Sequence, residues 1–358
     1  MARRLMAATR KGLFILERQG ESWQIARSAF LGDPVSLAMT DPRDGRLYAA
    51  LKLGHFGVKL HTSEDEGATW QEVACPAFPP AEGENGPSVL EIWALEPGKQ
   101  PGELWAGTIG GGLFHSTDEA ESWQLVDGLW NHPLRSNWLG GGNEAPGIHS
   151  ICVDPENPQH LTLAVSCGGV WQSQDGGASW RPTSEGIYAE FMPPERRNDP
   201  SIQDVHRLVQ CPARPSALWA QHHNGVFHST DAGESWQEVT AIKPSKFGFG
   251  VAVHPEDPER AWFVPAVKDE CRIPVDGAVV VARTTNGGRS FEVQREGLPQ
   301  RHAYDLVLRH GLAIDGTGQW LAIGSTCGHL WLSGDQGSRW QMAAGHLPPI
   351  YALSFAGA

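Results

Sequence analysis

Titratable and aromatic side chains recur at one position of several short apolar segments in this chain of 358 residues. In most of these segments the position lies six residues before a proline at the end of the segment. The residues at this position, or at the one that aligns with it, are Ser36, Glu91, His149, His206, Phe249, Tyr304 and Tyr351. Asp204 and His302 lie two positions earlier in their segments. Carboxyl and imidazole groups can transfer protons, so a site that gathers these residues could perform acid–base chemistry.

Further polar side chains lie in the turns that follow the next apolar segment along the chain. They are Arg10 and Lys11, Lys52 and His55, Ser166, His222, His223 and Asn224, Lys268, Asp269, Glu270 and Arg272, and Ser325 and Thr326. If these turns meet the first set of residues, the resulting site is more polar and titratable than a scaffold requires. The alternative is that these groups hydrogen-bond to one another and to trapped water.

A glycosidase reaction uses two carboxyl groups on either side of the scissile bond, one as a general acid and one as a base or nucleophile. The candidates are Glu91, Glu144, Asp204, Asp269, Glu270 and Asp305, and no spacing selects a pair among them. We hypothesise that Glu91, Asp204 or Asp269 acts as acid or base, that histidines orient groups or relay protons, and that an arginine binds an anionic group. The predicted catalytic residues are Glu91, Asp204, Asp269, His149, His206, His302 and Tyr304. The predicted substrate-binding residues are Arg272, Lys268, His222, His223, Asn224, Glu144, Trp138, Arg10 and His55.

The same histidines and carboxylates also suggest a metal site, because His149 and His206 occupy equivalent positions. The chain has no short-range ligand motif such as H-x-x-x-H, which favours His–carboxylate pairing without a metal. We therefore predict no metal and no cofactor. The absence of G-x-S-x-G also argues against a serine nucleophile.

An eight-residue motif indicates which elements position these residues. The pattern S-x-D-x-G-x-[ST]-W is complete at 63–70, 173–180 and 229–236, and eroded at 116–123, 284–291 and 333–340. Its Asp or Asn recurs at steps of 49 to 57 residues, and a nearly constant period is typical of repeat folds. The Asp can accept hydrogen bonds across a turn, and the Gly permits a positive φ. We therefore predict that these Asp-box turns are structural rather than catalytic.

The segments around each Asp-box turn predict four short strands per repeat, as in a propeller blade. Residues 4–23 supply a second and third strand without a first, whereas residues 350–355 form a first strand without followers. Joined together, they make a seventh blade and close the ring. We predict an all-β, seven-bladed β-propeller of four-stranded antiparallel blades, with residues 1–358 as a single domain. Strand order places the titratable residues at the channel mouth on one face and the Asp-box turns on the other.

On these motifs the chain resembles the BNR, or Asp-box, repeat propellers, which include sialidases, other glycoside hydrolases, sortilin-type receptors and photosystem assembly factors. The resemblance covers essentially the whole chain and is close to bacterial BNR-repeat glycosyl hydrolases. It implies hydrolysis of a carbohydrate at the channel mouth. The alternative that it implies is a non-catalytic propeller that binds a protein or small ligand, as in the receptors and assembly factors. Fold alone does not choose between them.

One short motif, Arg272-Ile273-Pro274, is similar to the R-I-P motif of sialidases. In that family the motif precedes the first Asp box of a six-bladed propeller. Here it follows four Asp boxes in a chain of seven predicted blades. We therefore do not expect sialidase activity.

Composition limits the partners. The formal charge is -13, and no basic run exceeds two residues, so nucleic acid and anionic membranes are unfavourable partners. We expect a carbohydrate or another small polar ligand instead. The six cysteines show no C-x-x-C spacing and are expected to be reduced. The N-terminal apolar stretch is too short for a signal peptide, which predicts a cytoplasmic protein.

Overall fold

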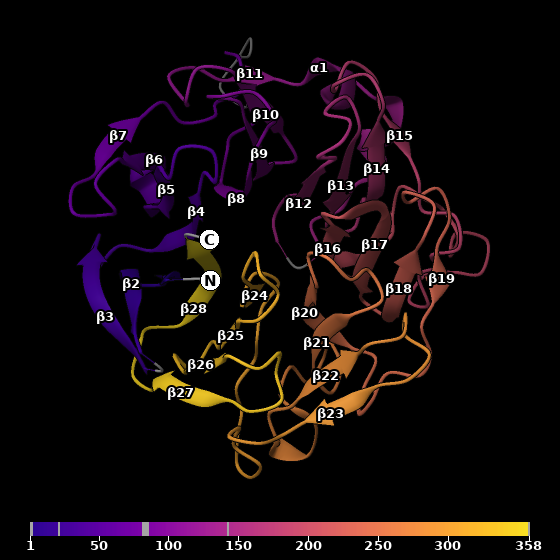
Figure 1. The fold of residues 1–358 in the computed structure, drawn as a ribbon. Helices are drawn as coiled ribbons and strands as arrows, with labels where there is room; N and C mark the ends of the chain where they lie inside the picture. The colour runs from indigo at the N-terminus through magenta and orange to yellow at the C-terminus, as the bar shows by residue number, and fades with distance from the viewer. Residues whose placement is uncertain (1–2, 21, 81–85, 142, 357–358) are drawn as a thin grey trace.

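The computed structural model describes residues 3–20, 22–80, 86–141 and 143–356. Its strands form seven four-stranded antiparallel sheets, arranged as the blades of a ring around a central channel (Figure 1). The predicted fold class is therefore confirmed. In the described part of the chain, no helix has the length and apolar character needed to cross a membrane.

The blades follow one another along the chain, except that the C-terminal strand joins the first. The first three blades are β28 (Ile350–Ala356) with β1 (Arg4–Thr9), β2 (Gly12–Gln19) and β3 (Ser22–Ala29); β4 (Val35–Thr40), β5 (Leu47–Lys52), β6 (Val58–Ser63) and β7 (Gln71–Val73); and β8 (Glu91–Pro97), β9 (Leu104–Ile109), β10 (Leu113–Ser116) and β11 (Gln124–Leu125). The next two are β12 (Ile148–Val153), β13 (Leu161–Val165), β14 (Gly169–Ser173) and β15 (Arg181–Pro182); and β16 (Val205–Cys211), β17 (Arg214–His222), β18 (Gly225–Ser229) and β19 (Gln237–Glu238).

The last two blades complete the ring. They are β20 (Gly248–Val253), β21 (Ala261–Pro265), β22 (Val281–Thr284) and β23 (Glu292–Gln294); and β24 (Leu312–Ile314), β25 (Leu321–Gly324), β26 (Leu330–Ser333) and β27 (Gln341–Ala344). The described part of the chain also has four short helices in its loops: η1 (Gly54–Phe56), α1 (Asp127–Trp130), η2 (Pro133–Asn137) and η3 (Val275–Gly277).

The ring closes where β28 pairs with β1, as the split terminal blade predicts. The antiparallel register runs from Arg4 opposite Ala356 to Thr9 opposite Ile350. Leu5 of β1 and Leu353 of β28 belong to the same buried cluster. The pairing therefore covers an edge of β1 that would otherwise expose unpaired backbone groups.

Large aromatic side chains fill the space between neighbouring blades. Trp171, Trp219, Trp262 and Trp331 lie on second or third strands, and all four are fully buried. Tryptophan buries one of the largest apolar areas of any side chain, so these rings contribute strongly to packing one blade against the next. Because the blades are held in this way, the loops at the channel mouth are carried on a rigid frame.

The Asp-box turns form the hydrogen bonds that the sequence predicts. Asp175 accepts bonds from the Ser173 hydroxyl at 2.8 Å, the Ser179 amide at 2.8 Å and the Ser179 hydroxyl at 2.6 Å. The Gly177 amide donates to Ser173 Oγ at 2.8 Å. Each box therefore ties the third strand of its blade to the fourth.

Acid should weaken these turns. Hydrogen bonds from Ser179 and Ser173 lower the pKa of Asp175 to about 2. A lowered pKa in the folded state gives stability that is present above the unfolded value and is lost as pH falls from about 4 to about 2. We expect the Tm of Asp175→Asn to fall less than that of the wild type over this range. The amide should still form the turn, because Asn286 accepts the Ser290 amide at 3.0 Å in another box.

Thermal unfolding followed by circular dichroism at several pH values tests this expectation. The exposed Asp127, which lies outside the boxes, provides the control substitution Asp127→Asn. Equal acid dependence in Asp175→Asn and the wild type would contradict it.

A second prediction concerns backbone strain in the box at 229–236. Ala232 has a φ of 62°, whereas glycines occupy the equivalent positions in two other boxes, with a φ of 68° at both Gly176 and Gly287. An alanine in this left-handed region costs about 1 kcal/mol relative to glycine. We expect Ala232→Gly to raise the free energy of unfolding by about that amount, and the matched Gly176→Ala to lower it similarly. Urea denaturation measures both, and a destabilised Ala232→Gly would refute the strain argument.

Candidate functional site

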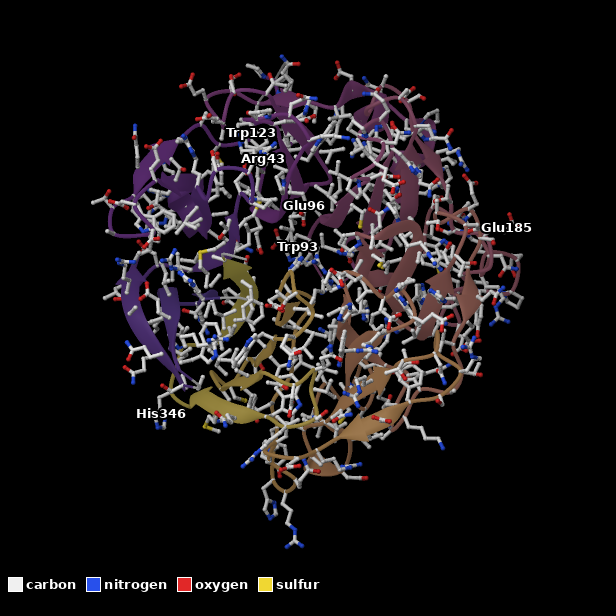
Figure 2. All side chains as sticks on the ribbon, in the orientation of Figure 1. Arg43, Trp93, Glu96, Trp123, Glu185 and His346 are labelled. Atoms are coloured by element: carbon white, nitrogen blue, oxygen red, sulfur yellow. The ribbon has the colours of Figure 1, made fainter. Side chains whose placement is uncertain are left out.

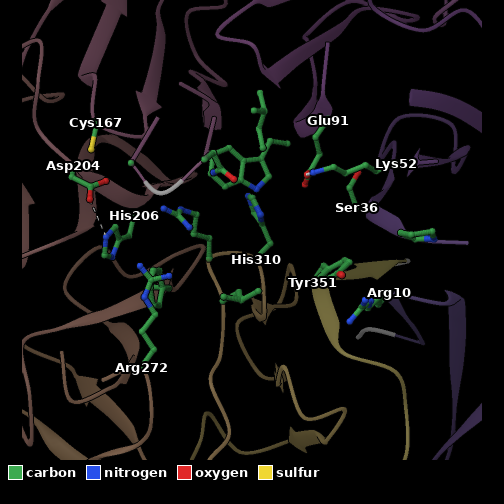
Figure 3. Close-up of a pocket in the computed structure, with 18 of the residues that line it drawn as sticks. Arg10, Ser36, Lys52, Glu91, Cys167, Asp204, His206, Arg272, His310 and Tyr351 are labelled. Atoms are coloured by element: carbon green, nitrogen blue, oxygen red, sulfur yellow. Dashed lines mark hydrogen bonds and ion pairs between the residues drawn. The ribbon is translucent and has the colours of Figure 1, made fainter. Parts of the chain in front are cut away.

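A cavity of about 1190 Å³ opens at one mouth of the central channel (Figure 3). The starts of first strands and the loops after second strands form its walls, as the strand order predicts. Among the predicted site residues, those that line it are Glu91, Asp204, His206, Asp269, Arg272, Arg10 and His223. The structure therefore brings together part of the predicted site from four different blades.

Three predicted catalytic residues do not line this cavity. His149 is fully buried, and its ring nitrogens contact Ser150 Oγ at 2.9 Å and the Val205 carbonyl at 2.7 Å. His302 and Tyr304 are exposed and precede β24 by several residues. They therefore lie outside β24, the first strand of their blade, although the repeat pattern predicted that they belong to it.

The register predicted for this last blade is therefore wrong. The Asp315 amide donates to the Trp320 carbonyl at 2.9 Å, just as the Asp41 amide donates to the Arg46 carbonyl at 2.8 Å in another blade. Counting back from these turns places His310, not Tyr304, at the position equivalent to Ser36. The alignment missed this because the segment ends in Asp315 without the proline that marks the other blades.

Several predicted substrate-binding residues also lie away from the cavity surface. Trp138 is buried, with its ring centroid 5.4 Å from that of Trp171, so it is a packing residue and not an exposed stacking platform. His222 is fully buried and accepts the Asn224 amide at 3.3 Å. Asn224 is buried as well, with its side-chain oxygen accepting the Glu190 amide. These groups stabilise loops at the rim.

The remaining three predicted binding residues are exposed but do not line the cavity. Lys268 pairs with Glu270 at 3.5 Å. His55 stacks on Phe56, with 3.9 Å between the ring centroids. Glu144 is exposed in the long loop before β12. Their sequence neighbours Asp269, Glu270, Phe56 and Asn143 line the cavity instead.

One wall of the cavity carries a cluster of Asp204, His206 and His223. Asp204 immediately precedes β16, His206 is the second residue of that strand, and His223 lies in the turn after β17. Asp204 Oδ2 is 3.5 Å from His206 Nε2 and 3.2 Å from His223 Nδ1. The pairing of β16 with β17 thus brings the two imidazoles to one carboxylate.

The electrostatics of this cluster follow from burial and mutual hydrogen bonding. Burial alone would raise the pKa of Asp204, but the bonds with His206 and His223 and the nearby Arg309 hold it well below its usual range. Burial lowers the pKa of His206, against the opposing effect of Asp204. The hydrogen bond with Asp204 raises the pKa of His223, although burial opposes this. The cluster is therefore built around an ionised carboxylate.

The other carboxylates of the cavity are held by basic side chains. Lys52 donates to Glu91 Oε2 at 2.9 Å, on the same side of the cavity as Tyr351 and Arg10 in Figure 3. Arg272 donates from Nε to Asp269 Oδ1 at 3.0 Å. Both carboxylates are partly accessible, with 16% of the Glu91 side chain and 34% of the Asp269 side chain exposed. They can reach a ligand without a change of the backbone.

Arg309 lines the cavity but is absent from the residues predicted from the sequence. Like His310, it lies in the segment that ends in Asp315 without a proline, so the repeat pattern did not reveal its position. Its guanidinium carbon lies 4.8 Å from the centroid of Trp93 and 5.4 Å from that of Phe249. Among the described residues, no carboxylate oxygen lies within ion-pair distance of it. Burial lowers the pKa of Arg309, although Asp204 opposes this. Because a guanidinium stays charged at neutral pH, Arg309 presents a positive charge to the cavity floor.

Below Arg309, side chains from opposite blades close the channel. His310 Nε2 lies 2.8 Å from the His149 carbonyl, and Arg207 donates to the same carbonyl at 3.1 Å. On the far side of this layer lies a smaller cavity of about 330 Å³, which Glu96 and Arg207 line. Figure 2 shows Glu96 and Trp93 near the centre of the ring. The cavity at the mouth is therefore closed at its inner end and is not an open channel.

Comparisons with known proteins agree with a carbohydrate-active fold. No protein-family model matches the chain. It is 31% identical over 151 residues to the "Probable oligoxyloglucan-reducing end-specific xyloglucanase" of Neosartorya fischeri, which covers 41% of this chain and 17% of that protein. It is 26% identical over 259 residues to the oligoxyloglucan-reducing end-specific xyloglucanase of Emericella nidulans, which covers 64% and 31%. The chain thus spans less than a third of the length of these curated relatives.

Solved structures show the same fold at low identity. The GH74 xyloglucanase of Xanthomonas campestris has a TM-score of 0.65 and 14% identity, over 96% of this chain and 53% of that one. YCF48 of Cyanidioschyzon merolae has a TM-score of 0.56 and 15% identity, over 93% and 96%. The structural matches establish the fold. Together with the sequence matches, they support a glycoside hydrolase-like propeller with distant homology to xyloglucanases.

A pH prediction follows from Glu96. Burial raises the pKa of Glu96 to about 7, against the opposing charge of Arg207. A raised pKa in the folded state gives stability that is complete below the unfolded value near 4.5 and is lost as pH rises through about 7. We expect Glu96→Gln to remove this loss, worth at most roughly 3 kcal/mol because the carboxyl is partly exposed to the smaller cavity.

Urea denaturation at pH 5 and pH 8 measures the difference. The variant should gain stability relative to the wild type at the higher pH. A constant difference between the two proteins at both pH values would contradict the assignment.

Proposed function

We propose that this chain is a glycoside hydrolase of the Asp-box propeller type, acting on a carbohydrate in the channel-mouth cavity. The observation that carries the proposal is the cavity itself, which combines partly accessible carboxylates with aromatic rings. Ligand pockets combine apolar walls with a few convergent polar groups in this way. The distant homology to xyloglucanases favours a polysaccharide or oligosaccharide over other small polar ligands.

The rings suit a sugar that enters from solvent. Phe56 and Phe191 lie at the cavity wall, with 70% and 46% of their surfaces exposed. Trp93 and Tyr351 also line the cavity and are partly buried. Exposed rings beside hydrogen-bonding groups offer the apolar face of a pyranose a surface to contact.

Two carboxylates line the cavity and are accessible to such a ligand. Glu91 and Asp269 come from different blades, and Lys52 and Arg272 hold their side chains in defined positions. In a glycosidase one carboxyl donates a proton to the leaving oxygen and the other acts as base or nucleophile. We assign these two roles to Glu91 and Asp269 as a pair.

We assign the anion-binding role to Arg309 instead of Arg272, the arginine predicted from the sequence. Arg272 is already bonded to Asp269, whereas Arg309 faces the aromatic rings Trp93 and Phe249. A guanidinium in such a setting can form a two-pronged contact with a carboxylate or another electron-rich group of the ligand. Arg309 would then orient the substrate from the cavity floor.

Hydrolysis assays test the proposal. The purified chain is incubated with xyloglucan oligosaccharides and with a panel of other neutral and acidic glycans, and new reducing ends are quantified. On any substrate that is cleaved, we expect Glu91→Gln and Asp269→Asn each to lower kcat by roughly 100-fold or more, as for loss of a general acid or base. Glu144 is an exposed carboxylate that does not line the cavity. Glu144→Gln is therefore the control and should keep wild-type activity.

Full activity in either cavity variant would refute the assigned pair. Binding of a glycan without any turnover would instead support a non-catalytic propeller. Binding is measured separately by calorimetry, so the two outcomes are distinguishable.

A further inference from the structure

The spacing of Asp204, His206 and His223 resembles that of metal ligands. One oxygen or nitrogen from each residue lies within 4.8 Å of those of the other two. Asp204 Oδ2 is 3.5 Å from His206 Nε2, and both residues are labelled in Figure 3. The same oxygen is 3.2 Å from His223 Nδ1. In a tetrahedral site with bonds near 2.1 Å, neighbouring ligand atoms are about 3.4 Å apart. The two distances from Asp204 are therefore close to those that a bound ion would give.

The tautomer of His206 gives a second, independent reason. His206 Nδ1 lies 2.7 Å from the Gly248 carbonyl, which can only accept a hydrogen bond, so Nδ1 carries a proton. In the neutral ring the lone pair of Nε2 then faces the carboxylate of Asp204. Two lone pairs in this arrangement repel each other unless a proton or a metal ion lies between them. Metal-binding histidines usually donate their other N–H to a backbone carbonyl in this way.

The surrounding residues hold these ligands rigidly. His206 stacks on Phe249, with 4.5 Å between centroids and 14° between ring planes. Only 2% of the His206 side chain and 9% of the Asp204 side chain are exposed. Asp204 Oδ1 is buried without a hydrogen-bond partner among the described residues, so protein donors leave this carboxylate partly unsatisfied. An ion bound by the carboxylate would compensate for this missing partner.

We propose that Asp204, His206 and His223 bind one divalent transition-metal ion of the Zn²⁺ class. Two imidazoles and one carboxylate suit Zn²⁺ and its neighbours, whereas Ca²⁺ and Mg²⁺ prefer oxygen ligands throughout. Because these residues line the cavity, the remaining coordination position of the ion would face the cavity interior. An ion there would polarise a bound ligand oxygen or activate a water molecule.

Nearby charges determine what the open position accepts. Arg309 interacts electrostatically with Asp204, and Arg272 with His223. These arginines weaken the binding of a bare cation, whereas they favour an anionic or oxygen-rich group as the further ligand. This metal site does not depend on the proposed glycoside hydrolysis, since neither Glu91 nor Asp269 belongs to it.

Calorimetry and metal analysis test the proposal on the full chain. After dialysis against a chelator, ZnCl₂ and CoCl₂ are titrated in turn, and bound metal is measured after gel filtration. We expect one equivalent to bind to the wild type, and the Kd of His223→Ala to be at least tenfold weaker, because even residues that only support metal ligands contribute that much. The matched control is His346→Ala, an exposed histidine at the outer edge of the ring (Figure 2), and it should bind as the wild type does.

Wild-type affinity in His223→Ala would overturn the proposal, as would the absence of stoichiometric binding by the wild type. Circular dichroism establishes that each variant is folded. If His223→Ala does not fold, the ¹⁵N resonance of His206 Nε2 in the wild type decides. It should shift on addition of Zn²⁺, and no shift at saturating Zn²⁺ would show that a proton alone joins His206 to Asp204. No substrate is needed, so failure here leaves the hydrolase proposal standing.

Discussion

The first strand of each blade contacts the first strands of its two neighbours, and this inner ring is complete only because β28 pairs with β1. Without that pairing, β1 would have a free edge, and β4 and β24 would lose the strand that lies between them in the channel wall. The two ends of the chain therefore hold together a structure in which the other contacting blades follow one another along the chain. The cavity at the mouth exists because the ring that surrounds it is closed.

This closure explains how polar side chains from distant parts of the chain come to line one cavity. Glu91, Asp204 and Arg309 are separated by more than a hundred residues at each step, yet each lies at or near the start of a first strand that faces the channel. The strands converge at the axis, so single side chains from several blades share one small volume. The layer of His149, His310 and Arg207 then blocks the channel and gives the cavity its floor.

Within the cavity, two regions differ in their charge pairing. Glu91 and Asp269 each have a basic partner that positions them for a ligand, which is the basis of the hydrolase proposal. Asp204 instead faces two imidazoles, one of which has its other nitrogen committed to a backbone carbonyl. The first arrangement suits proton transfer to a bound sugar, and the second suits a cation. Arg309 lies near members of both regions, since Asp204 and Asp269 both act on its charge.

The sequence by itself determined the repeat, the number of blades, the ring closure and the face that carries the cavity. Each of these follows from local patterns, because an Asp-box turn or an alternating strand is specified by residues close together in the chain. The tertiary structure alone decided which polar residues face the cavity. Trp138 and His222 have side chains suited to binding a ligand, but both are buried in the structure. Arg309 lines the cavity because it lies just before β24, which begins at Leu312. Such outcomes depend on side-chain packing between blades, which no spacing within one repeat encodes.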